Sequence, residues 1–389
     1  GSRTCTSSCR YVNSSYGSGV AMILSQLSLA NVRNYASLEF EPEPGLNVFV
    51  GPNAQGKSNL LEAIALLGTG KSFRTARESE IVRTGLPSAS LCGYARVSAG
   101  DIRLSCTLNI GGGGLRKIYT VNGAGVRYAS YLGKMRVVTF VPAHLALVTG
   151  PPSARRSLVN AALAQESPAY YGTLATYGKY VLQKNALLRG SIAPDEALLA
   201  TYDERLVEAG TRLILARRAF VAALDERAKA VHRSWVGDRE GELAIAYESD
   251  IPIDVPTSDA VAAAFVARLA QKRIAEVARR TSLVGPHRDD IAFRLGGVPL
   301  AAFGSQGQQR TAVLALKVAE YGVLEARSGE APLLLLDDVL SELDPERQRA
   351  FLRGVGSFEQ AFVTTTHDID VPVAAGYRIR AATLERISA

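Results

Sequence analysis

A short run of glycine, lysine and serine residues is typical of a site that binds phosphate groups. Residues 51–58 read GPNAQGKS and fit the pattern G-x-x-x-x-G-K-[ST]. In such a loop, successive backbone N–H groups and the N-terminus of the following helix hold the phosphates. Lys57 would place positive charge beside the β- and γ-phosphates, and the Ser58 hydroxyl would ligate Mg²⁺. The sequence therefore predicts a site for ATP and Mg²⁺ formed by Gly51, Pro52, Asn53, Ala54, Gln55, Gly56, Lys57, Ser58 and Asn59.

Two adjacent carboxylates could complete the chemistry of this site. The apolar run LLLLDD ends in Asp337 and Asp338, as a buried strand does when it delivers acids to the edge of a sheet. Asp337 would join Ser58 as a metal ligand, and Asp338 would polarise or orient the attacking water as general base. The alternative is a pair of acids that only caps the turn after the strand. A phosphate loop in the same chain favours the catalytic interpretation.

The elements around the loop fit this interpretation. Residues 22–50 read as strands that run into the loop, and Leu60, Leu61, Ile64 and Leu67 then recur at helical spacing. Residues 91–142 read as β-structure, and the Asn122-Gly123 pair is a hairpin signal. A strand before the loop and a helix after it are what a true phosphate loop requires.

A helical region separates the two halves of this α/β pattern. Ser167-Pro168 reads as the start of one helix and Pro194 as the start of another, whose apolar positions continue from Tyr202 to Trp235 over about 50 Å. We expect an antiparallel helical hairpin, with an ordinary helical lobe as the alternative. Short strand-like stretches at 242–248 and 289–300 interrupt the helices. The expected units are 1–21, 22–150, 151–281 and 282–389, the first being a cloning remnant outside the fold.

Three further motifs resemble those of the ATP-binding-cassette (ABC) superfamily. GSQGQQR at 304–310 resembles its signature motif, in which a helix N-terminus and a small hydroxyl residue face a γ-phosphate. SELD at 341–344 resembles the D-loop, and His367 after the strand AFVTTT resembles the histidine that senses the γ-phosphate. The resemblance implies that two copies enclose ATP, one contributing the phosphate loop and Asp337. The residues implied for the other copy are Ser305, Gln306, Gly307, Gln308 and Asp344.

Longer blocks resemble the RecF family of bacterial recombination mediators. They include ANVRNYASLEFEPEPGLNVFVGPNAQGKSNLLEAI, GKSFRT, FVPAHLALVTGPPSARRSLVN, LQKNALLR, VGPHRDD, FGSQGQQR and LLDDVLSELD. The resemblance implies an α/β fold: an ABC-ATPase head with a mixed sheet around the phosphate loop and an antiparallel β subdomain, interrupted by an α-helical lobe.

The same resemblance implies a function in DNA repair. It implies a cytoplasmic, ATP-driven head-to-tail dimer that binds double-stranded DNA and junctions of single- and double-stranded DNA, hydrolyses ATP weakly, and assists recombinase loading with RecR and RecO. Asp338 stands where most of the superfamily has glutamate, and its shorter side chain fits slow hydrolysis. Two other functions stay open: a structural DNA clamp with negligible turnover, and a transporter ATPase, which the long helical insertion disfavours.

The charge balance permits a nucleic-acid partner. The net charge is +7, or +5 without Arg3 and Arg10 of the first 21 residues. Apolar runs are too short to span a membrane. Basic groups are candidate DNA contacts, although solvated helix faces would look the same. These groups are Lys71 with Arg74, Arg155 with Arg156, and Lys272 and Arg273 with Arg279 and Arg280.

Overall fold

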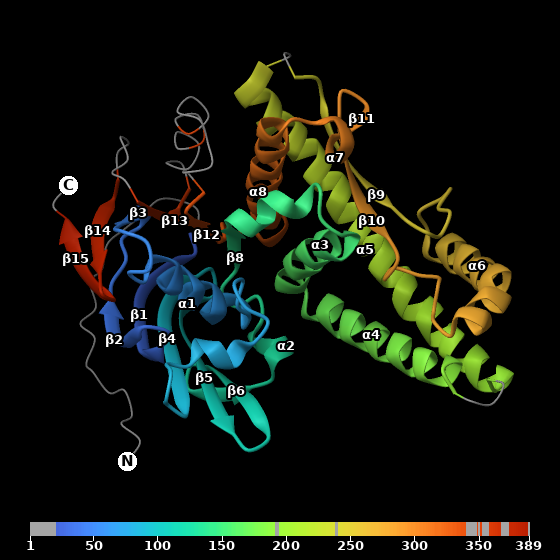
Figure 1. Ribbon diagram of the computed structural model, residues 1–389, viewed down its shortest axis with the longest axis horizontal. Helices are drawn as coiled ribbons and strands as arrows, with labels where there is room; N and C mark the ends of the chain where they lie inside the picture. Colours follow the sequence, from blue (N-terminus) through green and yellow to red (C-terminus); the bar gives the residue numbers. More distant parts are fainter. Residues whose placement is uncertain are drawn as a thin grey trace.

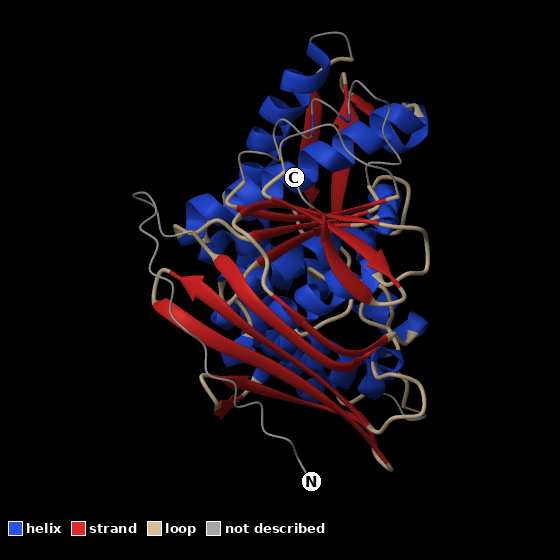
Figure 2. Ribbon diagram, turned by 90° about the vertical axis from the view of Figure 1, so that its left-hand side faces the viewer, coloured by secondary structure: helices blue, strands red, loops and turns tan. Residues whose placement is uncertain are grey.

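The fold combines two large sheets, a small third sheet and a lobe of long helices (Figure 1). The structure, a computed structural model, describes residues 21–190, 194–237, 240–339, 348, 351, 358–366 and 373–387. Figure 2 shows the two large sheets as separate layers.

The central sheet joins the two ends of the chain. Its spatial order is β15-β14-β3-β13-β12-β8, and all neighbouring strands are parallel except β14 and β15. The strands are β3 (Gly45–Val50), β8 (Val137–Phe140), β12 (Leu333–Asp337), β13 (Gln360–Thr365), β14 (Ala375–Arg380) and β15 (Thr383–Ile387). Because β3 pairs with β13, the phosphate loop lies beside strands more than 300 residues away in sequence.

The second large sheet is antiparallel and comes from the first third of the chain. Its order is β2-β1-β4-β5-β6-β7, and the hairpin between β6 and β7 turns at Asn122 and Gly123, with φ values of 51° and 84°. This conformation is the one that the Asn-Gly signal predicts. The strands are β1 (Ile23–Val32), β2 (Tyr35–Phe40), β4 (Ser88–Val97), β5 (Gly100–Gly111), β6 (Gly114–Val121) and β7 (Ala124–Val126).

Helix α1 (Lys57–Thr69) lies between the two large sheets. It contacts β1, β4 and β5 on one side and β8, β12 and β13 on the other. Its apolar positions, predicted from helical spacing, are all fully buried: Leu60, Leu61, Ile64 and Leu67. Enclosure from both sides fixes the orientation of the helix N-terminus that follows the phosphate loop.

The helical lobe is built around two long antiparallel helices. Contacts of Tyr170 with Arg217 and of Lys184 with Asp203 set the register of α4 against α5. Ser167 caps α4 as predicted, whereas Asp195 rather than Pro194 caps α5, because its carboxylate accepts from the N–H groups of residues 197 and 198. The long helices are α3 (Pro152–Glu166), α4 (Pro168–Leu188), α5 (Glu196–Val236), α6 (Ser258–Arg279) and α8 (Gln306–Ser328).

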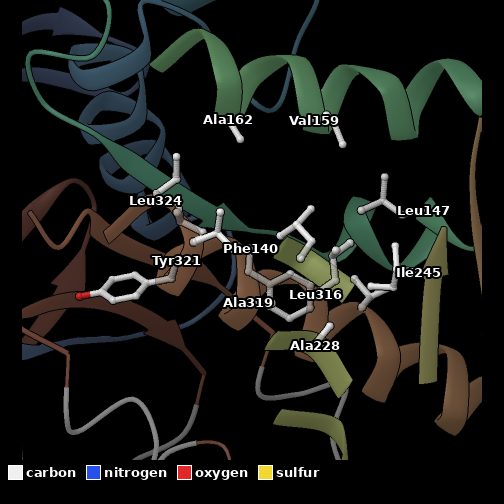
Figure 3. Close-up of a cluster of buried hydrophobic side chains, with 14 of the residues drawn as sticks. Phe140, Leu147, Val159, Ala162, Ala228, Ile245, Leu316, Ala319, Tyr321 and Leu324 are labelled. Atoms are coloured by element: carbon white, nitrogen blue, oxygen red, sulfur yellow. The ribbon is translucent and has the colours of Figure 1, made fainter. Parts of the chain in front are cut away.

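The lobe and the central sheet share a hydrophobic core. Figure 3 shows Phe140 of β8 among side chains of α3, α5, α8 and β9. The small sheet, in the order β11-β10-β9, packs on α5 and confirms both predicted strand interruptions. Its strands and the short helices are β9 (Leu243–Glu248), β10 (Asp290–Leu295), β11 (Val298–Pro299), η1 (Glu78–Ile81), α2 (Tyr128–Tyr131), η2 (Pro142–Leu147) and α7 (Leu300–Phe303). None of the described helices has the length and apolarity to cross a bilayer.

Candidate nucleotide site

Strand register brings the phosphate loop and the acid pair to one edge of the central sheet. Asp337 at the end of β12 is the register partner of Thr364 in β13, and Thr365 is the partner of Val50 at the end of β3. The carboxyl ends of neighbouring parallel strands face the same edge, which is where open α/β sheets bind ligands. The loop from Gly51 onward therefore starts beside Asp337 and Asp338.

The phosphate loop turns sharply before α1. Its backbone is left-handed at Ala54 (φ 65°) and at Gly56 (φ 118°), and α1 begins at Lys57. Successive N–H groups in such a turn converge and form an anion-binding concavity. Only glycine fits at position 56, because a Cβ there would lie 2.9 Å from the Tyr35 hydroxyl oxygen. Pro52, Asn53 and Ala54 are exposed, whereas Ser58 and Asn59 are half-buried.

Lys57 is held within the loop. Its side chain is 5% exposed, and its Nζ donates to the carbonyl oxygens of Gly51 at 2.5 Å and Pro52 at 2.8 Å. Burial lowers the pKa of Lys57, and the nearby charges of Asp338 and Asp337 oppose that change. An ammonium group whose hydrogen bonds go to neutral carbonyls fits a phosphate chain, whose negative charge would offset the cost of burial.

The two acids are oriented differently by one hydroxyl group. Thr364 Oγ1 donates to Asp337 Oδ1 at 2.9 Å and accepts from the Asp338 N–H at 2.9 Å. Asp337 is buried, and Asp338 has a left-handed backbone with φ 51°. The donor set at this edge, a carboxylate of Asp337 and the Ser58 hydroxyl, consists of the hard oxygen ligands that Mg²⁺ prefers, so the residues fit that ion.

Sequence reasoning missed several residues that support the loop. The side-chain amide of Asn34 donates to the Gln55 carbonyl at 3.3 Å and accepts from the Asn59 amide at 2.7 Å. Backbone N–H groups of Ala381 and Ala382 donate to the Gln55 side chain and carbonyl at 2.8 and 3.0 Å. The block ANVRNY contains Asn34, but its spacing alone does not point to a loop contact.

A buried carboxylate connects α1 to the segment that follows it. Glu62 is 1% exposed and accepts two hydrogen bonds from Arg33, both at 2.8 Å, and one from the Ser72 hydroxyl at 2.5 Å. Arg74 lies 3.6 Å from the same carboxylate and also donates to the side chain of Asn59. The GKSFRT segment is thus held against a residue of the phosphate loop.

The signature residues lie in a different part of the molecule. Ser305 caps α8 by accepting from the Gln308 N–H at 3.2 Å, and the Gln308 side chain accepts from the Ser305 N–H at 2.8 Å. Ser305 and Gln306 are exposed, and Gly307 is half-buried. The preceding α7 packs on β10 and β11, whereas α1 packs between the large sheets. Asp344 with the rest of SELD, and His367, lie outside the described residues.

The candidate DNA contacts separate into paired and unpaired groups. The prediction of Arg155 as a DNA contact is wrong. Arg155 is 9% exposed and forms an ion pair with Asp290 through two hydrogen bonds, so it is not available to bind DNA. Arg156 donates to the Asp289 carbonyl, and Arg273 pairs with Asp203. The side chains of Lys272, Arg279 and Arg280 have no hydrogen bond or ion pair with any described residue.

Comparison with known proteins identifies the family of this chain. The family model described as the RecF/RecN/SMC N terminal domain matches residues 23–377. A DNA replication and repair protein RecF from Thermosynechococcus vestitus is 42% identical over 94% of this chain and 95% of its own. One from Geobacillus thermodenitrificans is 37% identical over 93% and 99%. The chain belongs to the RecF family.

Solved structures agree with this assignment. Two structures of the recombination mediator protein RecF in the RecFOR pathway, one with ATP and one described as RecF-ATPrS, have a TM-score of 0.88 and 31% identity, covering 96% of this chain and all of theirs. An Smc head domain from Pyrococcus furiosus, at 15% identity and a TM-score of 0.53, shares the fold. The predicted α/β fold, an ABC-ATPase head interrupted by a helical lobe, is confirmed. This chain is a member of the RecF branch of ABC-type ATPases, a family of DNA replication and repair proteins.

Proposed function

We propose that this chain is an ATP-dependent DNA-binding switch of recombinational repair. The observation that carries the proposal is the separation of two half-sites. The phosphate loop and the acid pair share one sheet edge, whereas the exposed, capped N-terminus of α8 follows α7, which packs on β10 and β11. A helix N-terminus attracts phosphate, so the Ser305 end of α8 can complete the site of a second copy.

We propose the following roles for the site residues. Lys57 and the loop N–H groups bind the β- and γ-phosphates, and Ser58 with Asp337 holds Mg²⁺. The ion, when bound, neutralises charge that develops on the phosphates. Asp338 orients or deprotonates the attacking water. In the second copy, Ser305, Gly307 and Asp344 would face the γ-phosphate, and His367 would sense it.

Weak hydrolysis is part of this proposal. The Asp338 carboxylate is one methylene shorter than a glutamate would be, and Asp338 is tied to Thr364 through its backbone N–H. A base that reaches the water poorly gives slow turnover. Slow turnover gives the ATP-bound dimer time to act on DNA before hydrolysis releases it.

The partners are proposed from the relatives. Proteins of this family are named for DNA replication and repair, and the solved relatives for the RecFOR pathway. We propose duplex DNA and junctions of single- and double-stranded DNA as substrates, RecR and RecO as protein partners, assistance to recombinase loading, and a cytoplasmic location. The candidate DNA contacts are Lys71, Arg74, Arg156, Lys272, Arg273, Arg279 and Arg280.

Sedimentation with ATP and Mg²⁺, with and without duplex DNA, tests the switch. We expect a nucleotide-dependent dimer that binds DNA, and loss of both properties in Lys57→Met. Lys134→Met is the matched control, because Lys134 is exposed, lies outside the loop and is not among the candidate DNA contacts. A wild-type monomer that does not respond to nucleotide would contradict the proposal.

A further inference from the structure

A basic pocket opens on the helical lobe, between α6 and the VGPHRDD segment (284–290). Figure 1 shows α6 at the outer end of the lobe, away from the central sheet and α1. The pocket has a volume of about 320 Å³. We call it the α6 pocket; its lining residues are Asp250, Arg268, Lys272, Ala275, Arg279, Leu283 and Arg288.

The charges in this pocket are not balanced. Arg268 is paired with Asp250 at 3.0 Å. Lys272, Arg279 and Arg288 have no acidic partner among the described residues. Arg288 donates to the Ser282 carbonyl at 2.5 and 3.2 Å, which fixes its guanidinium group without neutralising it. Three positive charges around one recess favour a bound anion.

The VGPHRDD segment builds one wall of the pocket. His287 shares a 2.7 Å hydrogen bond with the Tyr177 hydroxyl, inside the lobe. Asp289 is 1% exposed and accepts from the Asp250 N–H at 3.0 Å, which places the carboxylate that holds Arg268. Arg288, between these two anchored residues, is exposed. The motif thus anchors itself through His287 and Asp289 and presents Arg288 to the pocket.

The opposite wall is a row of residues on one face of α6. Residues 268, 272, 275 and 279 are spaced four, three and four apart, so they line up along the helix. Lys272 and Arg279 are separated by about 10 Å along the axis at 1.5 Å per residue. Phosphates of one DNA strand repeat about every 3.4 Å along the duplex axis, so a row of this length spans about three phosphate steps. A ligand with a single carboxylate would leave part of this row of basic residues unpaired.

We propose that the α6 pocket binds backbone phosphates of duplex DNA, with Ala275 forming the hollow between Lys272 and Arg279. The inference rests on the proposed DNA-binding function and assigns one of its contact sites. It also assigns a role to VGPHRDD, which lies outside the nucleotide site.

A pair of substitutions at one position tests the pocket. Ala275→Glu places a carboxylate three residues after Lys272 and four before Arg279, where it pairs with both and fills the hollow. Ala275→Gln adds nearly the same volume without charge. With ATP and Mg²⁺, we expect Ala275→Glu to weaken duplex binding roughly five- to thirtyfold near 0.15 M salt, as when one or two phosphates are no longer neutralised. The slope of log K against log salt should become shallower by about 0.9 for each such phosphate. Ala275→Gln should bind much more tightly than Ala275→Glu.

A second variant removes the charges directly. Lys272→Gln with Arg279→Gln should reproduce the weaker binding and the shallower slope. Lys179→Gln is the control, because Lys179 is an exposed cation on α4 of the same lobe, does not line the pocket and is not among the candidate DNA contacts. Thermal unfolding midpoints confirm that the variants are folded, and ATP-dependent dimerisation should be unchanged in all of them.

The outcomes separate this inference from the proposed function. If the wild-type protein shows no ATP-dependent DNA binding, the proposed function fails and the inference fails with it. If the wild-type protein binds DNA and Ala275→Glu and Lys272→Gln/Arg279→Gln bind it equally well, only the inference is overturned. Equal losses in Ala275→Glu and Ala275→Gln would show a steric effect and would also overturn it. The substitutions could instead leave DNA binding unaffected but weaken the binding of inorganic pyrophosphate or poly-glutamate. The ligand of the pocket would then be a free phosphate or an acidic protein, and the inference would be overturned.

Discussion

Arg155 at the start of α3 and Asp290 at the start of β10 form two parallel hydrogen bonds of 2.7 and 2.8 Å. The same guanidinium group donates to the carbonyls of Leu147 and Gly150 at 2.9 and 2.7 Å. One buried cation therefore fastens the end of η2, the first helix of the lobe and the returning strand to one another. These hydrogen bonds join segments of the protein itself, so the Arg155 guanidinium group is not available to a DNA phosphate.

Replacement of Arg155 should reduce stability without changing DNA contacts. Arg155→Met removes the hydrogen bonds to the half-buried Asp290 carboxylate, which keeps the Ile291 N–H, and to the carbonyls of Leu147 and Gly150, a loss of about 2 kcal/mol. Urea unfolding should show this loss, and the salt dependence of DNA binding should keep the wild-type slope. Arg156→Gln should lose less stability, because it removes a hydrogen bond to one carbonyl. A shallower salt slope in Arg155→Met would show that this residue contacts DNA after all.

Glu62→Gln should loosen the phosphate loop. The substitution keeps the shape of the side chain but removes the charge that two Arg33 hydrogen bonds and the Ser72 hydroxyl share, a loss of about 2 kcal/mol. Because Arg74 contacts both Glu62 and Asn59, we also expect weaker ATP binding in equilibrium dialysis. Glu80→Gln is the control, since its exposed carboxylate accepts from no described residue other than Thr75, through the hydroxyl. Unchanged ATP affinity in Glu62→Gln would show that the Glu62 carboxylate does not support ATP binding by the loop.

Local signals were sufficient to predict the elements of the nucleotide site. The loop at 51–58, the helix after it and the buried strand ending at Asp337 each have a pattern that spans only a few residues, and all three elements are present. The Asn122-Gly123 turn and the Ser167 cap are also local, and both were predicted correctly. The domain boundaries and the roles of the site residues remain predictions.

Contacts between distant segments could not be predicted in this way. Thr364 orients both acids, but in the sequence it is one of three consecutive threonines, and only the pairing of β12 with β13 selects it. Arg155 and Arg156 read as equivalent basic residues, yet their positions on α3 bury one and leave the other half-buried. Such distinctions depend on tertiary packing, which one sequence does not display.

Acidification should destabilise the lobe through His287. Burial, together with the charges of Arg288, Arg156 and Lys184, lowers the pKa of His287 to about 4, although its contact with the Ser282 carbonyl acts in the opposite direction. The unfolded chain, with the ordinary value near 6.5, then binds more protons than the folded chain between pH 6.5 and 4. Stability from this residue is therefore complete above pH 6.5 and declines as the pH falls to 4.

Urea unfolding across this pH range measures the effect. His287→Gln should be less stable than the wild-type protein at pH 7, because it loses the contact with Tyr177, but its stability should fall less on acidification. His144→Gln is the comparison: burial lowers the pKa of His144 to about 3, so its own contribution continues to fall to a lower pH. Parallel pH profiles for the wild-type protein and His287→Gln would exclude a role for His287 titration.

Ser305→Arg should block the ATP-dependent dimer while leaving ATP binding to the monomer intact. Ser305 is exposed at the N-terminus of α8, so an arginine there projects outward into the surface that we propose meets the other copy's phosphate loop. The substitution also removes the cap to Gln308, a loss of about 1 kcal/mol that Ser305→Ala reproduces without the bulk or charge. Sedimentation with ATP should show monomers for Ser305→Arg and at least partial dimerisation for Ser305→Ala, with nucleotide affinity of the monomer unchanged in both. If Ser305→Arg formed dimers at the ATP concentrations that dimerise the wild-type protein, α8 would not face the second nucleotide. The proposal that two copies share each ATP site would then be wrong.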